Sequence, residues 1–289
     1  MPRSGRPAAG SSGSSERTGR WRLAWPVVAL VIVVGAVAAA GARRAMDRGG
    51  PVASKPTCTV RDGKASYRRP ADQVALASDL AAVGVRLGLP DHAITVALAT
   101  AMQESGLRNL RGGDRDSVGL LQQRPSQGWG KPAQLLDPAY AADAFYRRLL
   151  QVPGWERLDV TAAAQAVQRS ARPKAYAAWE PEARAFAKAF TGQSGAQLAC
   201  QSTRTTSGPR TRRAGSAAAS AVGGPEPGTV VTAKQGWVAA TWLVAHADGL
   251  GVTAVSFAGR RWTASGGNWK VDGPTRSAVA VEPTGPRAG

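Results

Sequence analysis

Residues 93–106 read AITVALATAMQESG, and this stretch decides the expected fold. The positions before Gln103 are apolar or small almost all round, which is typical of a central buried helix rather than a surface helix with one polar face. Gly106 stands directly after this run, where a glycine commonly ends a helix in the left-handed conformation. Glu104 is therefore expected at the end of a helix too apolar to be exposed.

Helical periodicity continues on both sides of this stretch. Apolar residues recur every three or four positions over 74–87, and the helix that they predict ends near Gly88 and Pro90. Three more helices are expected to begin near Pro138, Val160 and Pro181. Residues 58–200 are thus predicted to form several helices around a buried central one, with a small loop or hairpin region inserted after it.

Composition divides the chain into six segments. We expect a disordered basic tail over 1–22, a membrane-spanning segment over 23–42, a spacer over 43–57, the helical domain over 58–200, a disordered linker over 201–228 and a small α/β unit over 229–289. The last unit combines a helix-like run over 237–245 with alternating segments that predict strands. We assign no activity to it.

Residues 23–40 read LAWPVVALVIVVGAVAAA and carry no charge. A helix of this length reaches about 27 Å, just enough to cross a bilayer. The arginines before it favour an N-terminus inside the cell, so we expect a single-pass protein held in the membrane through Leu23 to Ala42, with its bulk outside the cytoplasm. The alternative is a signal peptide cleaved among the small residues 38–42, which would release a secreted protein.

The formal net charge of +18 is unevenly distributed, because residues 1–48 alone carry eight Arg against two acids. Such an excess suits a cytoplasmic flank, and the remainder suits an anionic polymer such as cell wall, or a membrane surface. No zinc-finger spacing or RNA-binding signature is present, so we expect no nucleic-acid partner.

Cys58 and Cys200 are the only two cysteines, and they bracket the helical block. In an exported chain such a pair predicts a disulfide. The two cysteines and the two histidines, His92 and His246, lie far apart in sequence and predict no zinc site.

Glu104 is the candidate catalytic residue. The negative end of a helix dipole and partial burial both disfavour its charged form, so we expect its pKa to be raised. A carboxyl group that stays protonated near neutral pH can protonate a glycosidic oxygen. On position alone, an ordinary surface glutamate in a fraying last turn is the simpler interpretation, and the neighbouring motifs reverse that preference.

The string ESGL at 104–107 is followed by SVGLLQQRP at 117–125, and later by Asp137-Pro138. In order and spacing these motifs resemble the lysozyme-like lytic transglycosylases of the soluble type. In that family a Glu-Ser pair ends the central helix, and a Gly-Leu-x-Gln-x-x-Pro segment forms the facing wall of the cleft. The resemblance covers about half of the chain. It implies a mainly α (α+β, lysozyme-like) central domain, here expected after a single transmembrane helix and before the small α/β unit.

The resemblance also implies roles for individual residues. Glu104 would be the general acid and later the base, while Ser117 and Gln122 would line the cleft. Ser105 is expected to orient the carboxylate by hydrogen bonding. The alternative for Ser117 and Gln122 is that they satisfy backbone groups in a turn.

Two aromatic residues are candidates for contact with a sugar. The family's third motif, Ala-Tyr-Asn, is matched only as Ala175-Tyr176 followed by Ala177, so Tyr176 either contacts substrate or fills the core. Trp129 is flanked by glycines that would leave its ring accessible, which makes it the preferred stacking platform. Its alternative is an anchor for its own loop.

Most glycosidases use two carboxylates. Asp114 and Asp116 are the possible second ones, although turn formation is the preferred explanation for both. If neither reaches the cleft, the resemblance implies that Glu104 alone cleaves the MurNAc-GlcNAc β-1,4 bond of peptidoglycan glycan strands. It would protonate that bond and then deprotonate the muramic C6 hydroxyl, closing a 1,6-anhydro ring without metal or organic cofactor. The alternatives are a hydrolytic muramidase and a non-catalytic cell-wall-binding scaffold with the same fold.

Overall fold

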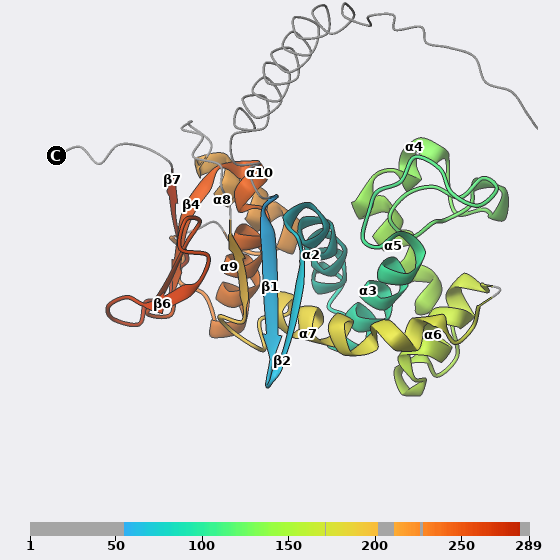
Figure 1. The fold of residues 1–289 in the computed structure, drawn as a ribbon, viewed down its shortest axis with the longest axis horizontal. Helices are drawn as coiled ribbons and strands as arrows, with labels where there is room; N and C mark the ends of the chain where they lie inside the picture. Colours follow the sequence, from blue (N-terminus) through green and yellow to red (C-terminus); the bar gives the residue numbers. More distant parts are fainter. Residues whose placement is uncertain (1–54, 171, 202–210, 226–227, 284–289) are drawn as a thin grey trace, which may run out of the picture. The chain divides into compact units, whose positions relative to one another are not determined.

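Helix α3 (Asp91–Ser105) lies at the centre of the computed structural model, which describes residues 55–170, 172–201, 211–225 and 228–283 (Figure 1). Every side chain from Ala93 to Met102 is buried. Helices α2 (Ala71–Arg86), α5 (Pro138–Leu149), α6 (Val160–Gln168) and α7 (Glu180–Phe190) pack around it. The predicted buried central helix is therefore confirmed.

The ends of these helices follow the expected local chemistry. Gly106 takes a φ of 62°, and its N–H donates to the carbonyl of Met102 over 3.1 Å. Asp137 caps α5 by accepting a hydrogen bond from the backbone N–H of Ala139 over 2.9 Å. The remaining short helices of this region are η1 (Pro125–Gln127), α4 (Pro132–Leu135), η2 (Trp155–Arg157) and η3 (Ala175–Trp179).

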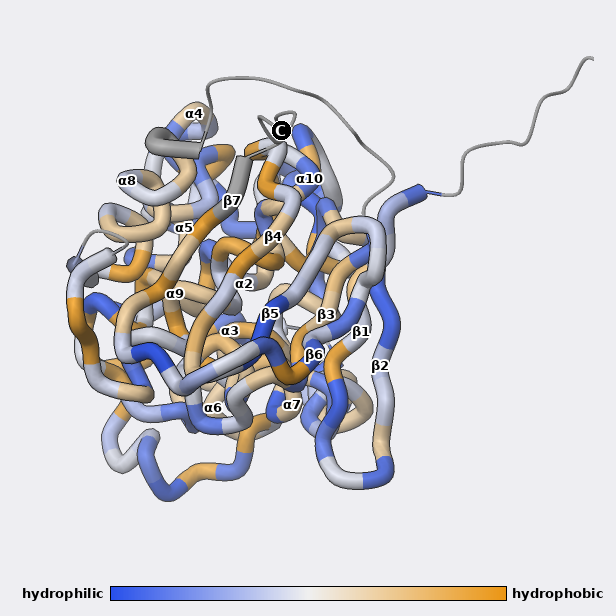
Figure 2. Tube along the Cα trace, turned by 90° about the vertical axis from the view of Figure 1, so that its left-hand side faces the viewer, coloured by the Kyte–Doolittle hydropathy of each residue, from blue (hydrophilic) through white to orange (hydrophobic). Residues whose placement is uncertain are grey.

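An antiparallel sheet that the sequence analysis did not predict joins the two ends of this block. Its strands are β1 (Thr57–Asp62), β2 (Ala65–Pro70) and β3 (Leu198–Gln201), in the order β2-β1-β3. The β1–β2 hairpin is largely hydrophilic (Figure 2). Strand β2 lacks the apolar alternation by which a strand is usually predicted, and in β1 only Cys58 and Val60 alternate into the core.

Cys58 lies directly opposite Cys200 in the pairing of β1 with β3, and the two form a disulfide. The predicted disulfide is thus confirmed. It joins residues separated by 142 positions, so it restricts most of the unfolded block.

The C-terminal region forms a helix and a second sheet, in the predicted order. Its elements are α9 (Ala233–Ala245), α10 (Ala247–Leu250), β4 (Val252–Phe257), β5 (Arg260–Thr263), β6 (Trp269–Val271) and β7 (Ala280–Pro283). The four strands are antiparallel and lie in the order β6-β5-β4-β7.

This region packs on the central helices, because α9 contacts α2, α7 and β3. Asp79 of α2 accepts a hydrogen bond from the indole of Trp242 over 3.2 Å and lies 3.0 Å from Nε2 of His246. The indole of Trp262 donates to the carbonyl of Cys200 over 3.0 Å. These tryptophans serve packing, and all described residues belong to one compact unit.

Helix α8 (Thr211–Val222) corrects the prediction of a disordered linker over 201–228. Ala214, Ala218 and Val222 recur at four-residue steps and are buried where α8 packs on α2 and α9. Small side chains suffice to pack this helix because they let neighbouring helices approach closely. The same small residues gave the segment the composition of a linker.

The expectation of a mainly α protein after a transmembrane helix is also corrected. The described residues mix helix with two sheets, of three and four strands. None of the helices within the described ranges is long and apolar enough to cross a membrane. The predicted tail over 1–22 and membrane segment over 23–42 lie outside those ranges.

Candidate active site

An open cavity of about 490 Å³ lies at the carboxyl end of α3. Its walls come from that helix end, the segment 114–129 and the end of α6. The described residues that line it are Glu104, Asp114, Arg115, Ser117, Gln122, Arg124, Gln127, Trp129, Gln168, Arg169 and Ser170. Glu104, Ser117, Gln122, Trp129 and Asp114 had been singled out from the sequence, and the fold brings all five to this cavity.

Glu104 is half-buried, and its Oε1 accepts a hydrogen bond from the hydroxyl of Tyr176 over 2.8 Å. Burial raises the pKa of the Glu104 carboxyl group, while hydrogen bonds from Tyr176 and Gln168 act in the opposite direction with less effect. The rise agrees in direction with the expectation from sequence, and burial is its main cause. A raised pKa suits a group that must deliver a proton.

Tyr176 is completely buried in η3 and is not accessible for stacking on a sugar. Burial also raises the pKa of its hydroxyl, so the group remains protonated and donates to Glu104. The expectation of a sugar contact is wrong for this residue. Its position fits a role in holding the carboxyl group of Glu104.

Ser105 directs its hydroxyl away from Glu104 and towards the second motif. Its Oγ donates to the carbonyl of Leu120 over 2.7 Å and accepts from the backbone N–H of Arg108 over 3.1 Å. The expected hydrogen bond to the carboxylate is therefore replaced by a link between the end of α3 and the facing wall. Ser105 is buried, so this link is protected from water.

Ser117 and Gln122 both satisfy the turn and line the cavity. Ser117 Oγ donates to the carbonyl of Asp114 over 2.8 Å and to Oε1 of Gln122 over 3.1 Å. Nε2 of Gln122 donates to the carbonyl of Gly119 over 3.0 Å. A Cβ at Gly113 would stand 1.7 Å from Oε1 of Gln122, so a larger residue there would displace this side chain.

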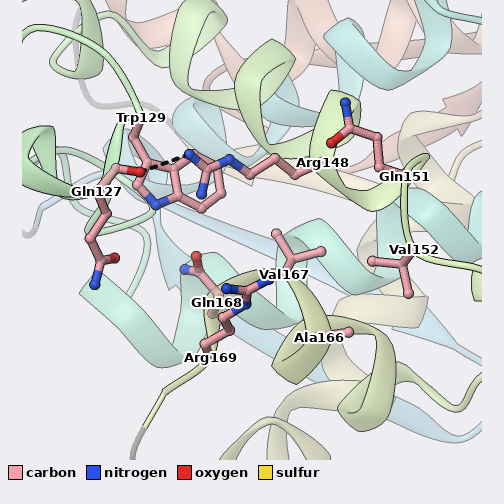
Figure 3. A pocket seen from close by; sticks show the side chains of 9 residues that line it. All are labelled: Gln127, Trp129, Arg148, Gln151, Val152, Ala166, Val167, Gln168 and Arg169. Carbon is pink, nitrogen blue, oxygen red and sulfur yellow. Dashed lines mark hydrogen bonds between the residues drawn. The ribbon is translucent and has the colours of Figure 1, made fainter.

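Trp129 is only 5% exposed, which contradicts its expected role as an open stacking platform. The guanidinium of Arg148 lies over its ring (Figure 3), 3.5 Å from the ring centre. Arg148 also donates to the carbonyls of Gln127 and Gly128, each over 3.1 Å. Trp129 thus anchors its loop, the alternative interpretation, because a side chain from α5 covers the face that its glycine neighbours leave open.

The two candidates for a second carboxylate differ sharply. Asp116 accepts hydrogen bonds from Nε of Arg124 over 2.7 Å and from the backbone N–H of Ser126 over 2.8 Å. These bonds hold its pKa well below the usual range, so it serves the turn. Asp114 lines the cavity with Glu104, but its side chain is 94% exposed, with Arg115 4.0 Å away.

The end of α6 was not predicted as part of the site, and there Gln168, Arg169 and Ser170 enter the cavity wall. Nε2 of Gln168 donates to the carbonyl of Leu121 over 2.9 Å, which ties this end to the second motif. A polar triplet that begins at the last residue of an apolar helix was the available signal, although it also fits an ordinary helix end.

Backbone strain gathers at the same cavity. Five described non-glycine residues have a positive φ, and three of them line the cavity: Arg115 at 57°, Gln122 at 48° and Arg169 at 52°. Such conformations cost of order 1–2 kcal/mol each and tend to persist where function needs them. The observation independently favours a functional site here.

No group of three or more potential metal ligands occurs among the described residues. Comparison with known proteins also leaves the family undecided, since no protein-family model and no curated protein matches this chain. A functional assignment must therefore come from the motifs and from the geometry around Glu104.

Proposed function

We propose that this protein cleaves the MurNAc-GlcNAc β-1,4 bond of peptidoglycan by lytic transglycosylation, with Glu104 as both acid and base. The observation that carries the proposal is a half-buried carboxyl group of raised pKa on the wall of a 490 Å³ cavity. The resemblance of residues 104–107 and 117–125 to the paired motifs of lytic transglycosylases supports the same chemistry.

In the first step Glu104 transfers its proton to the glycosidic oxygen, and the bond from that oxygen to C1 of the muramic sugar breaks. The hydrogen bond from Tyr176 to Oε1 holds the carboxyl group in place for this transfer. The resulting carboxylate then takes the proton of the C6 hydroxyl group, and the C6 oxygen forms a bond to C1. A 1,6-anhydro ring forms, Glu104 is protonated again, and no water is consumed.

A hydrolytic muramidase is the second candidate, and one observation favours it: Asp114 lines the same cavity as Glu104. A carboxylate there could position a water to attack C1. Its side chain is 94% exposed, which makes it the weaker candidate.

The disulfide between Cys58 and Cys200 supports a site of action outside the cytoplasm, because structural disulfides persist in oxidising compartments. Peptidoglycan lies in such a compartment. The proposed location and the proposed substrate are therefore consistent with one another.

The test is to incubate the purified full-length chain with peptidoglycan and determine the masses of the soluble muropeptides. Anhydro ends are expected, absent with Glu104→Gln and retained with Asp114→Asn. Products heavier by one water, lost with Asp114→Asn, would favour hydrolysis instead. Binding with no product from the unsubstituted protein would indicate a scaffold and would refute catalysis.

A further inference from the structure

A second cavity of about 530 Å³ adjoins the first and shares four wall residues with it: Gln127, Trp129, Gln168 and Arg169. It extends from this shared wall between α5 and α6 (Figure 3). A polymer bound across Glu104 in the first cavity would therefore also lie next to the opening of the second cavity. The proposed mechanism assigns no role to this space.

The charge of the second cavity is one-sided. Among the described residues that line it, Arg148 and Arg169 are the charged ones and none is acidic. Three glutamines, Gln127, Gln151 and Gln168, supply further polar groups. Figure 3 shows the two arginines entering from opposite walls, Arg148 from α5 and Arg169 from the end of α6.

Arg148 is held rigidly. Its guanidinium is stacked on Trp129 at 3.5 Å and donates to two backbone carbonyls of the 127–128 turn. Burial, and to a smaller extent the charge of Arg169, lowers its pKa. Among the described residues that line this cavity, no carboxylate accompanies the two arginines.

Arg169 is exposed and caps α6 with a φ of 52°. Within the described part of the chain, its guanidinium makes no hydrogen bond or ion pair, so its donors are available to a ligand. A strained backbone that presents an unpaired cation at a cavity is the arrangement expected of a binding group.

We propose that this second cavity is an oxyanion subsite that binds a carboxylate carried by the glycan substrate, so that the enzyme prefers acid-bearing strands over neutral sugar polymers. Guanidinium groups match the planar, two-oxygen geometry of a carboxylate, and their charge-assisted hydrogen bonds are strong. The expected substituent is a free carboxylate of the muramic side chain or its peptide. This assignment of the substrate class rests on the proposed function.

The test measures binding separately from turnover, using the full-length chain with Glu104→Gln to prevent cleavage. Titration calorimetry compares an N-acetylmuramoyl tripeptide that has free carboxylates with the same compound after its carboxylates are converted into amides. The acid is expected to bind about tenfold more tightly, as for one charge-assisted hydrogen bond, with a preference that weakens as salt rises.

Arg169→Gln should remove this preference and Arg169→Lys should keep part of it. The matched control is Arg147→Gln, on the same helix as Arg148, since Arg147 is exposed and paired with Asp143 over 2.6 Å. That control should bind like the parent. Circular dichroism establishes that each variant is folded.

Equal binding of acid and amide, or a preference unaffected by Arg169→Gln, would overturn the proposal. The affinity for inorganic phosphate is measured in the same way. A cavity that binds phosphate as tightly as the tripeptide acid is a general anion site and not one for a strand carboxylate. If the unsubstituted chain cleaves nothing yet the acid preference depends on Arg169, the subsite stands and the catalytic proposal fails.

Discussion

The buried hydroxyl of Tyr176 donates a hydrogen bond to Oε1 of Glu104 over 2.8 Å, joining η3 to the end of α3 across 72 residues of sequence. Burial raises the pKa of each group, so the tyrosine stays protonated and acts as the donor. Its hydrogen bond favours the charged form of Glu104 and partly offsets the effect of burial. The pair thereby sets both the orientation and the protonation of the carboxyl group.

Replacing the tyrosine, Tyr176→Phe, is expected to lower turnover by roughly tenfold, about the worth of one hydrogen bond to a charged group. It should also raise the pKa of Glu104, because the charged form loses its donor. The fall of kcat/KM at high pH, where Glu104 loses its proton, should then move to higher pH. The measurement is the pH profile on peptidoglycan, and a slower variant with an unmoved profile would mean that Tyr176 only fills the core.

Replacing the acid, Glu104→Gln, should change stability in a pH-dependent way. The pKa of Glu104 in the folded protein is raised above 4.5. Its protonated form therefore contributes stability at low pH, and this contribution is lost as pH rises through the folded pKa. The glutamine carries no charge to bury and still accepts from Tyr176. Its Tm relative to the parent should therefore increase from pH 4 to pH 7, and a difference independent of pH would contradict the burial of Glu104.

Replacing the link between the motifs, Ser105→Ala, should cost about 1–3 kcal/mol of unfolding free energy, because the buried carbonyl of Leu120 loses its donor. Cleavage should also fall, since the wall that carries Gln122 is no longer held to α3. Urea denaturation measures the first effect. Ser126→Ala in the exposed part of the same loop is the control, and equal losses in the two variants would contradict the special role of Ser105.

Removing the disulfide, with Cys58→Ser and Cys200→Ser together, should lower the unfolding free energy by about 4–5 kcal/mol, because the bond closes a loop of more than 100 residues. Denaturant unfolding of the variant should match that of the parent protein treated with reductant. A variant as stable as the oxidised parent would mean that the sheet β2-β1-β3 holds the ends of the block without it.

Local patterns were sufficient for much of the helical core. Apolar spacing predicted α2, α5, α6 and α7, and the uniformly apolar run before Glu104 predicted the buried α3. These predictions succeed because a helix satisfies its backbone hydrogen bonds within its own sequence. Strand β2 escaped prediction because its residues are mostly polar, and β1 because only Cys58 and Val60 alternate into the core. Strand β1 also pairs on its other edge with β3, which lies far along the chain.

The sequence by itself determined where the central helix lies, where Gly106 ends it, which two cysteines could pair and which carboxyl group stands at the helix end. Those properties depend on spacing and composition over a few residues. Only the tertiary structure decided that Tyr176 holds Glu104, that Arg148 covers Trp129, and that Asp116 belongs to Arg124 while Asp114 reaches the cavity. Each of these outcomes depends on which side chains come close together in the packed fold. Burial and charge pairing depend on those distances, which the spacing of residues along the chain does not fix.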